Sequence, residues 1–139
     1  MHISCYSFIE MAHHAEPLMS DGGALITMSY YGSEKVVTHY NIMGPVKAAL
    51  EATTRYLSAE LGCRNIRVFA VSPGPMQTRA ASGISHFDEL IEAAVSRSPG
   101  GRLVRIEEVG RVVAFLVGGA ASGMSGDTIY VDAGLHNVA

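Results

Sequence analysis

The segment "ALITMSYYGSEKVVTHYNIMGPVKAALEATTRYLSAELGCRNIRVFAVS" spans residues 24–72 and joins two short apolar runs through one long amphipathic stretch. The apolar runs, residues 24–30 and 66–72, have the length and composition of buried β-strands. The stretch between them has helical periodicity over residues 39–61 and is predicted to stop at Gly62, because glycine is typical just past a helix. A helical crossover brings the chain back to the same edge of a sheet, so the two strands are predicted to be parallel.

The rest of the chain continues this alternation of helices and strands. We expect helices over residues 4–19, in the segment that ends before Pro99, and over residues 106–117, and a third strand over residues 127–134. The strands are nearly continuous apolar runs, as in sheets that helices cover on both faces. The sequence therefore predicts an α/β fold in which three parallel strands with flanking helices form one domain, residues 1–139.

Composition excludes several classes of function. Hydrophobic residues make up 48% of the chain and charged residues 17%, which is typical of a folded globular domain. The net charge of −3, without a basic run, argues against nucleic-acid binding. No apolar run reaches the roughly 18 residues of a membrane-spanning helix. The six histidines lack the spacing of metal ligands, so we predict no metal site.

The cysteines and the first residues of the chain bear on localisation. Cys5 and Cys63 lack metal-type spacing and are predicted to be reduced thiols that pack in the core. The segment "MHISCYSFIEMAHH", residues 1–14, does not have the basic and long apolar regions of a secretory signal. We therefore predict a cytoplasmic protein.

Two tyrosine–lysine pairs are candidates for proton transfer. Tyr31 and Lys35 are four residues apart, and Tyr40 and Lys47 are seven apart. Seven residues turn through about 700° on a helix, so Tyr40 and Lys47 are expected to share one face. The lysine charge would favour the phenolate and ease proton loss from the tyrosine. Tyr31 and Lys35 would meet only on a helix, which glycine and the β-branched residues of "YGSEKVVT" disfavour.

Spacing alone does not establish that the Tyr40–Lys47 pair is functional. An ordinary amphipathic helix also carries a tyrosine and a lysine on one face without any catalytic role. Pro45 adds a constraint, because it cannot donate to the carbonyl of Asn41. The helix must therefore begin close to Tyr40 or bend there.

The loop "VSPGPMQTRAASG", residues 71–83, directly follows the second strand. Ligands of open parallel sheets bind beyond the carboxyl ends of the strands. Pro73 and Pro75 stiffen the loop, and Gly74 permits close approach to its backbone. Its N–H groups and the Thr78 hydroxyl suit an amide or a phosphate, although an ordinary turn explains the same residues.

Three segments together carry a family resemblance: "YNIMGPVKAALEATTRYLSAELG" (40–62), "IRVFAVSPGPMQTRAASGI" (66–84) and "IEEVGRVVAFLVGGAASGMSGDTIYVDAG" (106–134). They resemble the enoyl-acyl-carrier-protein reductases of the short-chain dehydrogenase/reductase superfamily. Most members of that superfamily place the tyrosine and lysine four residues apart, whereas enoyl reductases place them seven apart, as Tyr40 and Lys47 are here. Tyr31 with Lys35 is then a decoy.

The resemblance implies roles for individual residues. Tyr40 matches the catalytic tyrosine that hydrogen-bonds the thioester carbonyl, Lys47 the lysine that holds the nicotinamide ribose, and Tyr30 a second tyrosine near the acyl chain. The implied NAD(H)-binding residues are Lys47, Gly74, Pro75, Met76 and Thr78, with the Met76 backbone at the carboxamide and Thr78 at the pyrophosphate. The implied substrate-binding residues are Ala80, Ala81 and Ser82.

The resemblance also implies that the chain is the C-terminal half of a doubly wound Rossmann-type fold. The family begins with strands and a glycine-rich turn that hold the adenosine and pyrophosphate. No early G-x-G-x-x-G is present here, and "GGAASGMSG" (118–126) comes too late. The N-terminal dinucleotide-binding strands are therefore expected to be missing.

The implied function is the NADH-dependent reduction of trans-2-enoyl thioesters, linked to acyl carrier protein, in fatty-acid synthesis. A homo-oligomer, either dimer or tetramer, is also implied, since helices of this superfamily pack between subunits. Two alternatives stay open: another short-chain dehydrogenase/reductase, and an inactive fragment that serves only for association. The long helix also carries a stripe of side chains at helical spacing, which are Leu50, Thr53, Thr54, Leu57 and Leu61. This stripe could pack against another subunit or against the sheet of the chain itself.

Overall fold

The computed structural model describes residues 1–76 and 87–138. Its three strands form one parallel sheet in the order β1-β2-β3: β1 is Gly23–Met28, β2 is Ile66–Pro73 and β3 is Thr128–Val131. Gly23 of β1 lies opposite Ile66 of β2, and Ala70 of β2 lies opposite Thr128 of β3. The predicted parallel sheet of three strands is confirmed.

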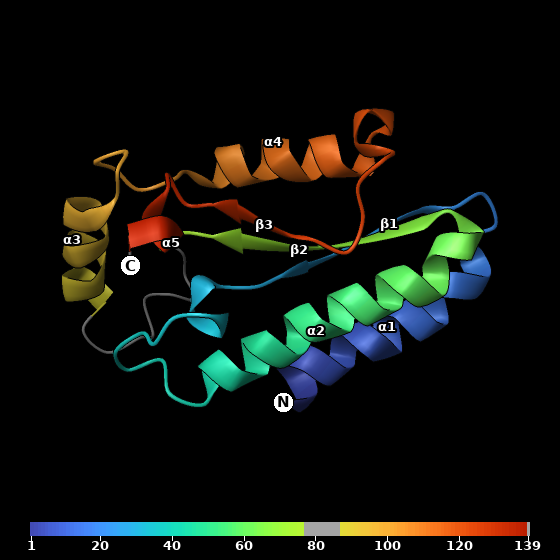
Figure 1. The fold of residues 1–139 in the computed structure, drawn as a ribbon, viewed down its shortest axis with the longest axis horizontal. Helices are drawn as coiled ribbons and strands as arrows, with labels where there is room; N and C mark the ends of the chain where they lie inside the picture. The colour runs from blue at the N-terminus through green and yellow to red at the C-terminus, as the bar shows by residue number, and fades with distance from the viewer. Residues whose placement is uncertain (77–86, 139) are drawn as a thin grey trace.

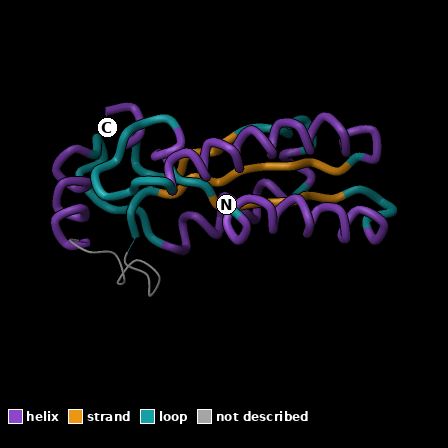
Figure 2. The backbone as a smooth tube through the Cα atoms, turned by 90° about the horizontal axis from the view of Figure 1, so that it is seen from below, coloured by secondary structure: helices purple, strands orange, loops and turns teal. Residues whose placement is uncertain are grey.

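Helices cover both faces of this sheet (Figures 1 and 2). One face carries α1 (Ser7–Ala15) and α2 (Met43–Leu61), and the opposite face carries α4 (Ile106–Val117). At the end toward which the strands point lie α3 (Phe87–Arg97) and α5 (Leu135–Val138). The predicted bounds of the helix over residues 106–117 agree with α4.

The long helix begins later than predicted. We expected a helix from residue 39, but α2 begins at Met43. His39 and Asn41 have φ angles of 65° and 49°, in the left-handed region that a continuing helix does not use. The missing N–H of Pro45 is harmless here because it falls in the first turn of α2.

The first helix also differs from its predicted form. The helix expected over residues 4–19 is a π-helical turn at His2–Tyr6, then α1, then a 3₁₀ turn at Glu16–Leu18. The predicted stop of α2 at Gly62 is confirmed, although Gly62 has an ordinary helical φ of −60° and is not a left-handed cap. After one 3₁₀ turn, Asn65 supplies the left-handed residue, with φ 58°.

The core lies on both sides of β2. Ile66 and Val68 pack with α1 and α2 on one face, while Phe69 and Val71 pack with α4 on the other. All four side chains are at most 1% exposed. This two-sided burial explains why β2 reads as an uninterrupted apolar run.

Other expectations have mixed outcomes. Cys5 is buried as predicted, but Cys63 is exposed, because it lies in the turn after α2. Within residues 1–76 and 87–138, no helix has both the length and the hydropathy to cross a membrane. The α2 stripe belongs in part to the core of the chain itself, since Leu50, Thr54 and Leu61 are buried there.

Replacing Leu50 by alanine is expected to destabilise the fold strongly. Leu50 is 2% exposed in the core cluster beneath the sheet, so Leu50→Ala should lower the free energy of unfolding by about 2–5 kcal/mol. Arg55→Ala, at an exposed position on the same helix, should change it by less than about 0.5 kcal/mol. Urea denaturation followed by circular dichroism measures both. Similar losses in the two variants would contradict this packing.

Candidate functional site

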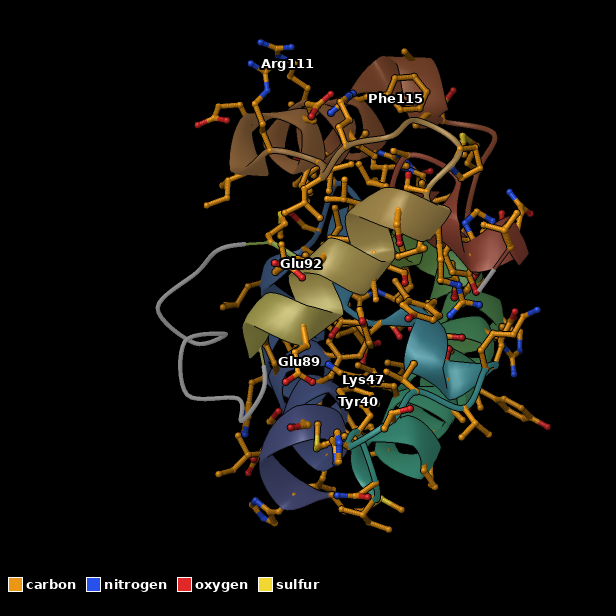
Figure 3. The ribbon with its side chains drawn as sticks, turned by 90° about the vertical axis from the view of Figure 1, so that its left-hand side faces the viewer. Tyr40, Lys47, Glu89, Glu92, Arg111 and Phe115 are labelled. Atoms are coloured by element: carbon orange, nitrogen blue, oxygen red, sulfur yellow. The ribbon has the colours of Figure 1, made fainter. Side chains whose placement is uncertain are left out.

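The candidate site lies at the edge of the sheet where the parallel strands end. Tyr30 comes two residues after β1, and the loop from Gly74 to Met76 follows β2. Figure 3 views the molecule from this edge, and the labelled side chains of Tyr40 and Lys47 lie close together there in projection. Loops at this edge are the usual ligand-binding elements of open parallel sheets.

Tyr40 and Lys47 reach this edge by a route other than the one predicted. Tyr40 precedes α2, in a turn where its N–H donates to Val37 and its carbonyl accepts from Met43, at 3.1 Å each. The helical-repeat argument for a shared face was therefore wrong, because only Lys47 belongs to the helix. Lys47 Nζ donates to the carbonyl oxygen of Met28, the last residue of β1, at 2.6 Å.

Two glycines, which sequence reasoning missed, hold Tyr40 in place. A Cβ atom on Gly32 would lie 2.7 Å from Cδ1 of the Tyr40 ring, closer than real Cβ contacts come. A Cβ on Gly44 would lie 2.9 Å from the carbonyl oxygen of Gly32. Gly44 thus lets the first turn of α2 approach Gly32, and Gly32 lets the Tyr40 ring pack on its backbone. The sequence signal was a glycine directly after the tyrosine pair.

The tyrosines form an aromatic cluster. The Tyr30 ring centroid lies 5.0 Å from that of Tyr40 and 4.6 Å from that of Tyr31, both tilted. Burial raises the pKa of Tyr40 to about 12, so its phenol stays protonated near neutral pH. Burial also raises the pKa of Tyr30, and the neighbouring Tyr31 adds to the shift. Both phenols are therefore hydrogen-bond donors under physiological conditions.

Lys47 and Glu51 form the charged part of the site. Burial lowers the pKa of Lys47, and the carboxylate of Glu51, one helical turn further on, opposes that shift. Glu51 is only 5% exposed. Its Oε1 accepts hydrogen bonds from the hydroxyls of Ser29 and Ser33, the latter at 2.7 Å. Sequence reasoning missed all three residues of this network, although Glu51 stands four residues after Lys47.

A third group at this edge comes from β3 and α5. The Tyr130 ring stacks on the His136 imidazole, with centroids 3.9 Å apart. Buried Asp132 accepts from His136 Nδ1 at 2.9 Å and from the backbone N–H groups of Gly134 and His136. Burial raises the pKa of Tyr130 to about 12. These contacts fix the chain directly after the last strand.

The loop after β2 is described only in part. Gly74 is buried, and the neighbour it accommodates is Asp132, whose Cβ would lie 3.0 Å from a Cβ on Gly74. Pro75 follows as a buried residue, and half-buried Met76 packs against the core cluster under α4. The remaining predicted site residues fall outside the described residues; they are Thr78, Ala80, Ala81 and Ser82. The cofactor and substrate roles of the whole loop stay predictions.

A parallel sheet with covering helices, and with polar side chains gathered at its carboxyl edge, defines the class of Rossmann-type α/β proteins. A sequence model of the family described as enoyl-(acyl carrier protein) reductase matches residues 1–136. The chain belongs to this family.

Individual relatives agree with that assignment. The chain is 49% identical to enoyl-acyl-carrier-protein reductase (NADH) 1 of Rhizobium meliloti, over 99% of the chain and 51% of the relative. It superimposes on the Anaplasma phagocytophilum reductase, solved in complex with NAD, with a TM-score of 0.93 and 49% identity, over 99% of this chain and 52% of the other. For the Bacillus cereus reductase, solved with NADP⁺ and an indole naphthyridinone, the TM-score is 0.94 at 40% identity, over 98% and 53%. The chain spans about half the length of the relatives it matches.

Adding a methyl group at Gly32 is expected to displace Tyr40. Gly32→Ala should lower the free energy of unfolding by about 1–3 kcal/mol, because the new Cβ overlaps the tyrosine ring. Gly62→Ala is the matched control, since a Cβ there would meet no non-neighbouring group of the described residues within 4 Å, and φ is helical. The control should be neutral or stabilising by up to about 1 kcal/mol. Denaturation curves measure the free energy of unfolding, and near-UV circular dichroism reports the environment of the tyrosines. An unchanged near-UV signal in Gly32→Ala would contradict the packing of Tyr40 on Gly32.

Proposed function

We propose that this chain supplies the catalytic and nicotinamide-side half of an NADH-dependent enoyl-acyl-carrier-protein reductase of fatty-acid synthesis. The observation that carries the proposal is a half-buried tyrosine and lysine, Tyr40 and Lys47, at the carboxyl edge of the sheet in a member of this family. The Rhizobium meliloti relative is named for NADH, and the Anaplasma phagocytophilum structure contains NAD. The substrate class is a trans-2-enoyl thioester carried on acyl carrier protein.

The donors at this edge fit the nicotinamide end of the cofactor. An ammonium group has three N–H donors, and Met28 accepts one of those of Lys47. The other two suit the vicinal hydroxyls of a ribose. The backbone of Gly74, Pro75 and Met76 would border the carboxamide, and the Thr78 hydroxyl would contact the pyrophosphate. NADH supplies the hydride when bound.

The residues of the chain itself act on the substrate oxygen. The neutral phenol of Tyr40 donates a hydrogen bond to the thioester carbonyl and stabilises the negative charge that develops there. The positive charge of Lys47 lowers the cost of that charge further. Tyr30, packed on the Tyr40 ring, would border the acyl chain, and the small side chains of Ala80, Ala81 and Ser82 would leave room for it.

Loss of the Tyr40 hydroxyl is expected to reduce turnover strongly. The assay uses a chimera in which the part of the Rhizobium meliloti enzyme that this chain does not cover is joined ahead of Met1, where the resemblance puts the dinucleotide-binding strands. With a crotonyl thioester and NADH, Tyr40→Phe should lower kcat by about 10²–10⁴-fold. Lys35→Ala, which removes the exposed lysine of the decoy pair, should leave kcat unchanged.

Two results of this assay would refute the proposal. One is full turnover by Tyr40→Phe, which would mean that Tyr40 is not the catalytic group. The other is faster turnover of a 3-ketoacyl thioester than of the enoyl thioester, which would favour another short-chain dehydrogenase/reductase. An inactive chimera that still folds would favour the fragment with an association role alone.

We further propose that residues 1–139 are part of one Rossmann-type domain that assembles into a homo-oligomer through α1 and α2. On the outer face of these helices, Ile9, Met11 and Tyr56 are 39%, 46% and 73% exposed. Ile9 and Tyr56 also line a groove of about 340 Å³. A second copy of the chain has the matching apolar face, because a two-fold interface is self-complementary.

A charge in this face is expected to prevent association. Tyr56→Glu should convert an oligomer into monomers at micromolar concentration in sedimentation experiments, because it buries a carboxylate in an apolar interface. Val36→Glu, at a fully exposed apolar position in a loop, is the control and should leave the oligomer intact. A wild-type chain that sediments as a monomer would refute the proposal that the chain forms a homo-oligomer.

A further inference from the structure

We propose that Glu51 is a positioning residue of this site: its carboxylate fixes the segment that carries Tyr30 and places a negative charge one helical turn from Lys47. This inference rests on the proposed function for its catalytic consequence, but the two contacts that carry it belong to the chain itself. Glu51 acts through the residues around it, because its hydrogen bonds go to Ser29 and Ser33.

The surroundings of Glu51 are unusual for a carboxylate. Glutamate is almost never fully buried unless it is paired, and Glu51 is 5% exposed. Among residues 1–76 and 87–138, its hydrogen-bond donors are two serine hydroxyls, and no cation lies within ion-pair distance. Hydroxyl donors stabilise a buried carboxylate only in part, so its negative charge acts on the nearest cation across a poorly screened environment.

The two serines lie on either side of the tyrosine pair. Ser29 directly follows β1, where its N–H donates to the Val71 carbonyl at 2.7 Å. Ser33 ends the 3₁₀ turn Tyr31–Ser33. Because one oxygen, Oε1, accepts from both hydroxyls, Glu51 ties the two ends of the Tyr30–Tyr31 segment to α2. The Tyr30 ring then fixes the position of Tyr40 through their contact.

The charge of Glu51 acts on Lys47, which stands one turn earlier on α2. Burial favours the neutral amine of Lys47, and two groups oppose burial: Glu51 on the same helix and Cys5 on the packed N-terminal turn. Glu51 thus places, one turn from Lys47, a negative charge that favours the ammonium form of the lysine.

The chain offers a direct test, because Lys35 and Lys47 are its only two lysines. Lysine labelled with ¹³C at Cε gives two NMR signals, and Lys35→Arg identifies the signal of Lys47. Titration of the 139-residue chain then follows the Lys47 signal by itself. Glu51→Gln keeps the size of the side chain but removes its charge, and it should lower the Lys47 pKa, because the anion that opposes the effect of burial is lost.

Ser33→Ala is the matched control, because it removes one hydrogen bond to Glu51 and keeps the charge. It should leave the Lys47 pKa unchanged, since the charge near Lys47 is unchanged. Two results would overturn the inference: an unchanged or raised Lys47 pKa in Glu51→Gln, or an equal shift in Ser33→Ala. The titration requires no turnover, so an inactive chimera would count against the proposed function and not against the role of Glu51.

Discussion

The burial of β2 on both faces is the constraint on which the other features depend. A strand between two layers of helices must have parallel neighbours, because helical crossovers bring the chain back to the same edge. The carboxyl ends of the three strands therefore meet at one edge, where residues distant in sequence come together: Tyr30 after β1, Gly74 after β2 and Asp132 after β3. The hydrogen bond from Lys47 to the Met28 carbonyl joins α2 to this edge, so the position of the lysine follows the position of the sheet.

The sequence predicted elements with strong periodicity and missed details that depend on tertiary contacts. The parallel strands and the bounds of α4 followed from apolar patterns that reflect burial directly. The start of α2 did not, because no pattern reveals the left-handed φ angles of His39 and Asn41. Glu51 could be assigned to the same helix as Lys47 from spacing, but its hydroxyl partners come from a segment 18 to 22 residues away. Gly32 is decisive only because the Tyr40 ring packs on it, and the linear sequence does not contain that contact.

Burial has opposite effects on the two central groups of the site, and both effects favour the uncharged form. It raises the pKa of the Tyr40 phenol to about 12 and lowers the pKa of the Lys47 ammonium. In the proposed mechanism, a neutral phenol suits a donor that keeps its proton until negative charge develops on the substrate. The same proposal gives the lysine a role that uses its charge and its donors. Glu51, one turn beyond Lys47, supplies a negative charge that opposes the effect of burial on the lysine.

Two surfaces away from the candidate site are not covered by the described part of the chain: the outer edge of β1 and the outer side of α4. In the described residues β1 pairs only with β2, so its other edge has no partner strand. On the opposite side of the sheet from α1 and α2, the exposed apolar side chains of α4 include Ile106, Phe115 and Val117, at 59%, 46% and 52%. Figure 3 shows Phe115 on α4, on the other side of the molecule from Tyr40 and Lys47. Open strand edges and exposed apolar side chains are surfaces that further protein could cover. The chain spans about half the length of its relatives, which have more chain to place against such surfaces.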